Sequence, residues 1–165
     1  MSNNDIDEIK LAKTAIIAFG LISLFGDIIY EGARGIVPSY LNVLLAPAVI
    51  VGFALGLGEF LGYALRLVFG SLADTTKAYW ALTILGYCLL ISIPVLAFTT
   101  NWQIAIILVI IERIAKAIRS PARDTLLSVT TRAYGRGKAF GLHELLDQIG
   151  AILGPTIVVV SIFYY

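Results

Sequence analysis

The sequence predicts an all-α membrane protein, a bundle of five transmembrane helices that form a single domain over residues 14–165. Hydrophobic residues make up 59% of the 165 residues and charged residues only 14%, against about 25% in ordinary soluble domains. Five apolar segments each have close to, or more than, the roughly 20 residues that a helix needs to cross hydrocarbon. The connections between them are too short to hold a soluble domain, so we expect most of this region to lie in the membrane.

The five predicted spans cover residues 14–45, 48–72, 79–98, 103–120 and 139–164. The first is longer than one crossing requires, so we expect it to tilt or to start deeper. The connection with the sequence "RDTLLSVTTRAYGRGK" is expected to be a basic loop. The N-terminal segment, residues 1–13, lacks the basic region that opens a signal peptide, so the first span should be retained.

Glycines recur at helical spacing on the second predicted span. They form two pairs, each with three residues between its members: Gly52 with Gly56 and Gly58 with Gly62. Such pairs favour close contact between membrane helices. The alternative is that they reflect only the general abundance of glycine in membrane helices.

The distribution of basic residues predicts the orientation. Lysine and arginine occur in the N-terminal segment, the second connection and the region around the fourth connection, at Lys10, Lys13, Lys77, Arg119, Arg123, Arg132, Arg136 and Lys138. The first and third connections and the C-terminal end carry none. Because basic residues mark the cytoplasmic side, we expect a multi-pass plasma-membrane protein with residues 1–13 in the cytoplasm and the end of the fifth span outside.

Ionisable side chains lie within every predicted span except the third. They are Asp27, Glu31 and Arg34, then Glu59 and Arg66, then Glu112, Arg113, Lys116 and Arg119, and finally His143, Glu144 and Asp147. A charge near the membrane centre costs about 2.5–3.5 kcal/mol, so the fourth span should insert only with acidic partners. We therefore expect Arg113 and Lys116 to face acidic residues of the first, second or fifth span, around a hydrated path.

Purely structural explanations exist for these charges. The whole set could form an ion-pair network without a transport role. Glu112 could be a local partner of Lys116, which lies four residues further along the helix. Arg119 could extend to the membrane interface, as long basic side chains near helix ends do.

The segment "GLHELLDQIGAILGP" suggests a zinc-protease helix at first sight. The zinc motif H-E-x-x-H, however, requires a second histidine where Asp147 stands. Zinc sites use three or four ligands, and this chain has one histidine and one cysteine. We therefore expect no metal site, no cofactor and no enzymatic activity.

The same segment suggests a proton relay instead. His143 and Asp147 are four residues apart and share one face of a helix. At 1.5 Å per residue, Asp147 lies about 13 Å beyond Lys138, near the middle of a core about 30 Å thick. Histidine titrates near neutral pH, so this pair is a candidate site for proton coupling.

Four stretches resemble the N-terminal half of a major facilitator superfamily transporter, over about residues 14–165. They are "GDIIYEGARGIVPSYL", "GEFLGYALRLVFGSLAD", "ERIAKAIRSPARDTLL" and "GRGKAFGLHELLDQIGAILGP". The matching positions are Asp27, Glu31, Pro38, Glu59, Arg66, Gly70, Asp74, Arg113, Lys116, Arg119, Pro121, Arg123, Asp124, Gly137, Phe140, Gly141, His143, Asp147, Gly150, Gly154 and Pro155. Two departures concern the loop "GSLADTTKAY", which lacks the family's following Arg and Gly, and the pair Val158 and Val159, which replaces two glycines.

The buried charges, the loop motif and the glycines of the fifth span suggest roles for three groups of residues. The proton-coupling or substrate path would comprise Asp27, Glu31, Glu59, Arg66, Arg113, Lys116, His143 and Asp147. The gating loop would contain Gly70 and Asp74, and Gly150, Gly154 and Pro155 would pack and kink the fifth span.

The resemblance also implies an incomplete transport path, because family members have twelve spans and this sequence shows five. We expect a subunit or fragment of a secondary active, proton-coupled small-solute transporter that needs a partner half or a homo-oligomer. The alternative is a non-transporting membrane interaction module or remnant. The expected partners are the lipid bilayer and an unidentified solute, and the net charge of +1 gives no indication of nucleic-acid binding.

Overall fold

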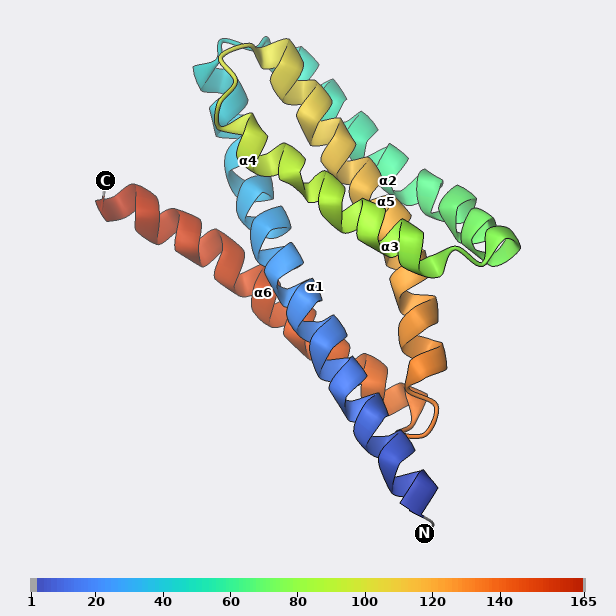
Figure 1. Ribbon diagram of the computed structural model, residues 1–165. Helices are drawn as coiled ribbons and strands as arrows, with labels where there is room; N and C mark the ends of the chain where they lie inside the picture. The colour runs from blue at the N-terminus through green and yellow to red at the C-terminus, as the bar shows by residue number, and fades with distance from the viewer. Residues whose placement is uncertain (1–2, 165) are drawn as a thin grey trace. The chain divides into compact units, whose positions relative to one another are not determined.

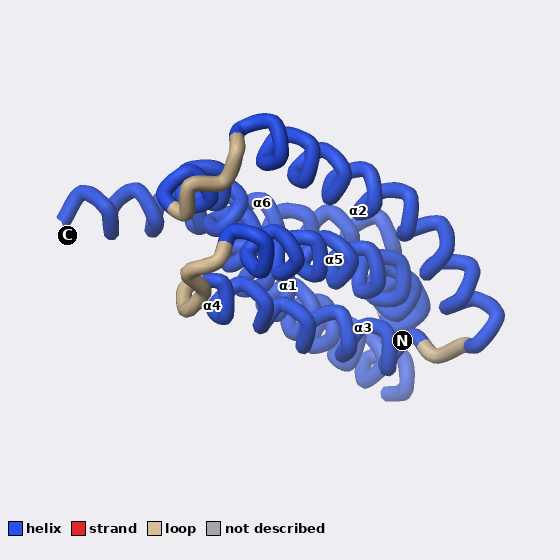
Figure 2. The backbone as a smooth tube through the Cα atoms, turned by 90° about the horizontal axis from the view of Figure 1, so that it is seen from above, coloured by secondary structure: helices blue, strands red, loops and turns tan. Residues whose placement is uncertain are grey.

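The computed structural model describes residues 3–164, and within that range every regular element is a helix. In chain order these are α1 (Asn3–Val43), α2 (Ala48–Thr76), α3 (Tyr79–Cys88), the 3₁₀ turn η1 (Leu89–Ile91), α4 (Ser92–Leu96), α5 (Trp102–Thr130) and α6 (Arg136–Tyr164), as Figure 1 shows. The predicted all-α class is confirmed. Figure 2 shows that loops are confined to short connections between long helices.

Four helical segments are long and apolar enough to cross a membrane, namely Asp7–Val43, Ala48–Thr76, Tyr79–Leu96 and Arg136–Tyr164. The helix α5 is long enough, but its middle contains the charged run from Glu112 to Arg119. Its hydropathy alone therefore does not mark it as a span. Insertion of α5 would depend on neighbouring helices that supply partners for its charges.

The helix α1 is longer than predicted, since it begins at Asn3 rather than near Thr14. Its 41 residues correspond to about 60 Å, twice the hydrocarbon thickness of about 30 Å. The predicted third span, in contrast, is interrupted by η1. Pro94 lacks the N–H that would bond to the carbonyl of Leu90, so the helix tightens at this point.

The predicted basic loop after the fourth span is mostly helix, which corrects the sequence-based assignment. The helix α5 continues through Pro121 to Thr130, and α6 begins at Arg136. Tertiary packing explains the extension, because Leu127 is buried with Ile16, Phe19 and Ala139. Only residues 131–135 form the turn, which ends at Gly135 with a φ of 100°.

The helices divide between two compact units. The first contains α1 up to Gly32, the end of α5 from Asp124, and α6. The second contains α1 from Ala33, then α2, α3, η1, α4, and α5 up to Arg123. Each unit has its own group of buried apolar side chains and its own group of charged residues.

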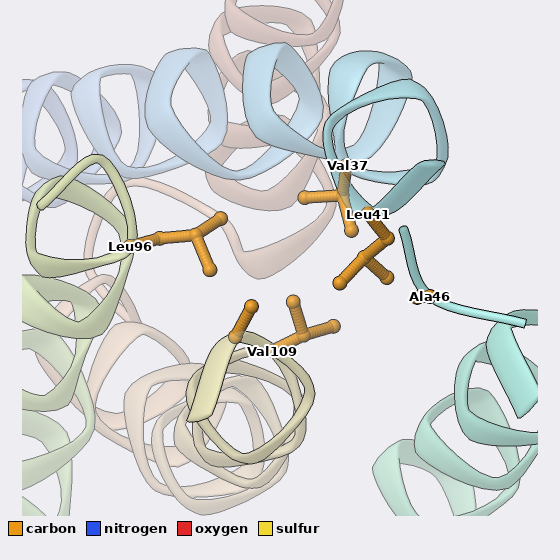
Figure 3. Packing of buried hydrophobic residues seen from close by; sticks show 6 residues of the cluster. Val37, Leu41, Ala46, Leu96 and Val109 are labelled. Atoms are coloured by element: carbon orange, nitrogen blue, oxygen red, sulfur yellow. The ribbon is translucent and has the colours of Figure 1, made fainter. Parts of the chain in front are cut away.

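The apolar core of the second unit lies where the C-terminal end of α1 meets α4 and the first turns of α5. Figure 3 shows Val37 and Leu41 pointing toward Leu96 and Val109. Beside this core the Tyr40 hydroxyl donates to the carbonyl of Leu96 at 3.1 Å and to that of Thr99 at 2.6 Å. These contacts hold α1 against the end of α4.

Large apolar side chains are exposed along the outer faces of the helices. On α2 they include Phe53, Phe60 and Leu67, and on α6 they include Ile157 and Phe163. A soluble protein rarely exposes so much contiguous apolar surface. Such faces are suited to contact with lipid, as the composition predicted.

Candidate functional site

Glu59 is the centre of a charged cluster in the second unit. Its Oε1 lies 3.3 Å from Nη2 of Arg34 on α1 and 3.3 Å from Nη2 of Arg113 on α5. The two guanidinium groups differ in exposure, since the Arg34 side chain is 50% exposed and that of Arg113 only 6%. The carboxylate therefore links α1, α2 and α5, and Arg113 faces an acid of the second span, as expected.

Two glycines beside Glu59 allow α5 to approach α2. A Cβ atom on Gly58 would lie 3.3 Å from Cγ of Arg113, and one on Gly62 would lie 3.7 Å from the Arg113 carbonyl oxygen. The other predicted pair, Gly52 and Gly56, has open space at the corresponding positions. Of the two predicted pairs, only Gly58 and Gly62 lie close to another helix.

Glu112 is a candidate site residue that the family resemblance did not select. Its side chain is 3% exposed, and its Oε2 lies 3.5 Å from Nη1 of Arg113. Its Oε1 is buried and accepts no hydrogen bond from any residue that the structure describes. The spacing of four residues to Lys116 suggested a local partner on the same helix, and this alternative stays a prediction.

Arg119 is buried in the second unit, which does not support the alternative that its side chain extends toward the membrane interface. Its side chain is only 1% exposed, and its guanidinium carbon lies 4.7 Å from the ring centroid of Tyr87 on α3. Gly86 makes this possible, because a Cβ atom there would lie 2.5 Å from Cβ of Arg119. Lys116, also on α5, is half-buried.

Arg66 lies one helical turn from Gly62 but interacts with its own helix. Its guanidinium carbon lies 5.0 Å from the ring centroid of Tyr63. Its buried Nε has no hydrogen-bond partner among residues 3–164. The stacking on Tyr63 thus does not join Arg66 to the Glu59 cluster.

The first unit contains His143 and Asp147 of α6, the pair that the sequence analysis proposed for proton coupling. Nδ1 of His143 lies 3.2 Å from Oδ1 of Asp147, and both side chains are largely buried. The remaining ring nitrogen of His143, Nε2, has no hydrogen-bond partner in the described part of the chain. The helical spacing of four residues produces this contact, as predicted.

Asp27 of α1 lies on the side of α1 that packs against α6. A Cβ atom on Gly150 would be 2.6 Å from the Leu24 carbonyl oxygen and 3.3 Å from Cβ of Asp27. Asp27 is buried, and Glu31 follows one turn later at intermediate exposure. The first unit thus places a carboxyl group of α1 near the helix face of α6 that carries Asp147.

The close α1–α6 contact continues toward Pro155. A Cβ atom on Gly154 would be 2.6 Å from the Ile28 carbonyl oxygen and 2.8 Å from the Gly32 nitrogen. Pro155 lies within α6, which continues to Tyr164. Gly150 and Gly154 therefore pack against α1 in the manner that their spacing suggests.

The residues assigned to a gating loop lie in the last turns of α2. A Cβ atom on Gly70 would be 3.6 Å from Cβ of Pro121 on α5. Asp74 accepts a hydrogen bond of 3.2 Å from the Tyr79 hydroxyl. The chain then turns at Lys77, which has a φ of 56° in the left-handed region that favours glycine. This is the position at which the family pattern has its glycine.

Known proteins resemble this chain over most of its length. An uncharacterised protein of Mycobacterium tuberculosis is 45% identical over 141 residues, which are 85% of this chain and 34% of that protein. An uncharacterised transporter of the major facilitator type from Methanocaldococcus jannaschii is 29% identical over 163 residues, 98% of this chain and 40% of that protein. Multidrug resistance protein MdtH of Photorhabdus laumondii is 31% identical over 111 residues, 67% of this chain and 27% of MdtH.

These comparisons concern only a part of each relative, since the chain spans between about a quarter and two fifths of their lengths. No family model and no solved structure matches the chain. Together with four helices that are long and apolar enough to cross a membrane, the similarities support a membrane protein that resembles part of a major facilitator transporter.

Proposed function

We propose that this chain forms part of a proton-coupled secondary transporter for a small solute, in the plasma membrane. It would require a second transporter half or further copies of itself to complete a path. The observation that carries the proposal is the burial of ionisable side chains in long apolar helices. Arg113, Glu112 and His143 are nearly inaccessible, and membrane proteins retain such costly groups chiefly for ion, proton or substrate paths.

Each compact unit contains a group of charged residues, and the contacts of both groups support a role in transport. In the first unit, Asp27, His143 and Asp147 place titratable side chains where α1 and α6 pack closely. In the second, Glu59 holds two arginines from different helices. A structure in which acids and bases link separate helices can couple a change of protonation to a movement of helices.

The similarity to MdtH makes drug efflux the first activity to assay. A fluorescent cationic dye is a suitable probe, because its exit from energised cells can be followed continuously. The alternative, a membrane interaction module without transport, predicts no dye efflux and no response to a proton gradient. In that case the charged groups would serve assembly alone.

The proposed orientation has the N-terminus in the cytoplasm and the C-terminal end of α6 outside. The asymmetry of lysine and arginine between the connections supports it. A reporter active only in the cytoplasm, fused before Met1, is expected to be active, as is one active only outside, fused after Tyr165. Activity of a cytoplasmic reporter at Tyr165 would contradict a five-span topology with α5 as a full span.

Replacement of Asp147 by Asn is expected to leave membrane abundance unchanged and to abolish gradient-driven dye efflux. Asparagine is similar in size and keeps a polar oxygen beside Nδ1 of His143, but it cannot bind the coupled proton. The measurements are immunoblots of membrane fractions and dye efflux, with the remainder of the transporter co-expressed. The control is Glu144→Gln, which changes an exposed carboxylate of the same helix.

Two results of this experiment would refute the role of Asp147. Normal efflux by the Asp147→Asn variant would show that no essential proton resides there. Loss of the protein from the membrane would instead indicate a permanent counter-charge, since removal of one partner of a buried pair costs about 3–5 kcal/mol.

A further inference from the structure

We propose that Glu112 is a proton-binding site, which holds a neutral carboxylic acid while Arg113 is paired with Glu59. The proposal rests on the proposed function, because it names a group that would bind a coupled proton. The sequence placed Glu112 among the charges of the fourth span, but the family resemblance did not select it for the path. The evidence comes from its surroundings in the second unit.

The carboxyl group of Glu112 is poorly supplied with hydrogen-bond donors. Its Oε1 is buried and has no partner among the described residues. Its Oε2 lies 3.5 Å from Nη1 of Arg113, a long contact between consecutive residues, which do not face each other on a helix. A carboxylate can accept about four hydrogen bonds, so burial with so few donors disfavours the charged form.

The charges around Glu112 act in opposite directions. Arg113, Lys116 and Arg119 lie on the same helix and carry the opposite charge to a carboxylate, whereas Glu59 on α2, which shares Arg113, carries the same charge. The nearest of the cations, Arg113, is shared with Glu59, whose Oε1 lies at the shorter distance of 3.3 Å. The attraction of Arg113 is therefore divided between the carboxyl groups of Glu59 and Glu112. The Glu112 side chain, in contrast, is almost completely removed from water.

The protonation state of Glu112 affects the ion pair between Arg113 and Glu59. When Glu112 loses its proton, the O–H bond breaks, the proton passes to water, and the electron pair stays on the carboxylate. Arg113 then faces two anions, Glu59 on α2 and Glu112 on its own helix. Arg34 remains 3.3 Å from Glu59 and can compensate that carboxylate. Deprotonation thus weakens the ion pair that joins α5 to α2.

The test is infrared spectroscopy of the full chain in lipid vesicles near neutral pH. The carbonyl stretching band of protonated carboxylic acids is expected in the wild-type protein and reduced in Glu112→Gln by the contribution of one group. Glu144→Gln, which alters an exposed carboxylate bonded to Gln148 at 2.8 Å, should leave the band unchanged. The Glu112→Gln variant should also reach wild-type abundance, because its side chain reproduces the neutral acid.

Two outcomes would overturn the proposal. One is an identical band in the wild-type protein and in Glu112→Gln. The other is failure of Glu112→Gln to accumulate in the membrane, which would show that the fold requires a charge at this position. Neither measurement depends on transport, so a protein with the band but without dye efflux would retain the proton site while refuting the proposed function.

Discussion

Replacement of Glu59 by Gln is expected to remove most of the protein from the membrane. The change leaves Arg113, which is 6% exposed, without the carboxylate at 3.3 Å. Removal of one partner from a buried ion pair costs about 3–5 kcal/mol, a large part of the total stability of about 5–15 kcal/mol that proteins have. The measurement is the amount of folded protein in membrane fractions, together with the unfolding temperature of what remains.

Two further variants identify the cause of this loss. Glu144→Gln makes the same chemical change at an exposed position and should leave abundance unaffected. In the double variant Glu59→Gln with Arg113→Gln, the guanidinium that Glu59 compensated is removed as well, so part of the abundance should return. Wild-type abundance of the Glu59→Gln variant alone would contradict the ion-pair role of Glu59.

Replacement of Gly154 by Val is expected to be the most damaging change in the first unit. A Cβ atom at this position would lie 2.6 Å from the Ile28 carbonyl oxygen and 2.8 Å from the Gly32 nitrogen. Both neighbours are backbone atoms, so α1 and α6 must separate to admit a side chain. Insertion of extra atoms into a packed contact costs about 1–3 kcal/mol, and the lost contact along the two helices adds to it.

The same helix provides the control for this prediction. A Cβ atom on Gly141 of α6 would meet no neighbouring helix within 4 Å, so Gly141→Val tests the intrinsic effect of valine in a helix alone. Thermal unfolding of both variants in detergent should show a much lower midpoint for Gly154→Val. Equal midpoints would mean that the close α1–α6 contact does not contribute to stability.

The all-α class and the main helices followed from the sequence because they depend on local properties. Apolar runs of sufficient length predict helices in a membrane, since the backbone must satisfy its own hydrogen bonds there. The pairing of His143 with Asp147 was predictable for the same reason, because a spacing of four residues places two side chains on one helix face.

Contacts between different helices depended on the tertiary structure. The sequence identified Glu59 and Arg113 as charges of opposite sign, but only the packing shows that Arg34 shares the same carboxylate oxygen. It could not distinguish Gly58 and Gly62, which admit Arg113, from Gly52 and Gly56, which face open space.

The same limit explains why the sequence did not show the burial of Glu112 and Arg119, or the helix in the predicted basic loop. Helical periodicity tells which residues share a face, but not which helix covers that face. Arg119 is buried because Tyr87 and Gly86 of α3 lie against it. The end of α5 stays helical because Leu127 packs with residues of α1 and α6 that are distant in sequence. The sequence by itself determined the helices and the inventory of their charges, whereas burial by distant helices decided which charges are paired and which lack donors.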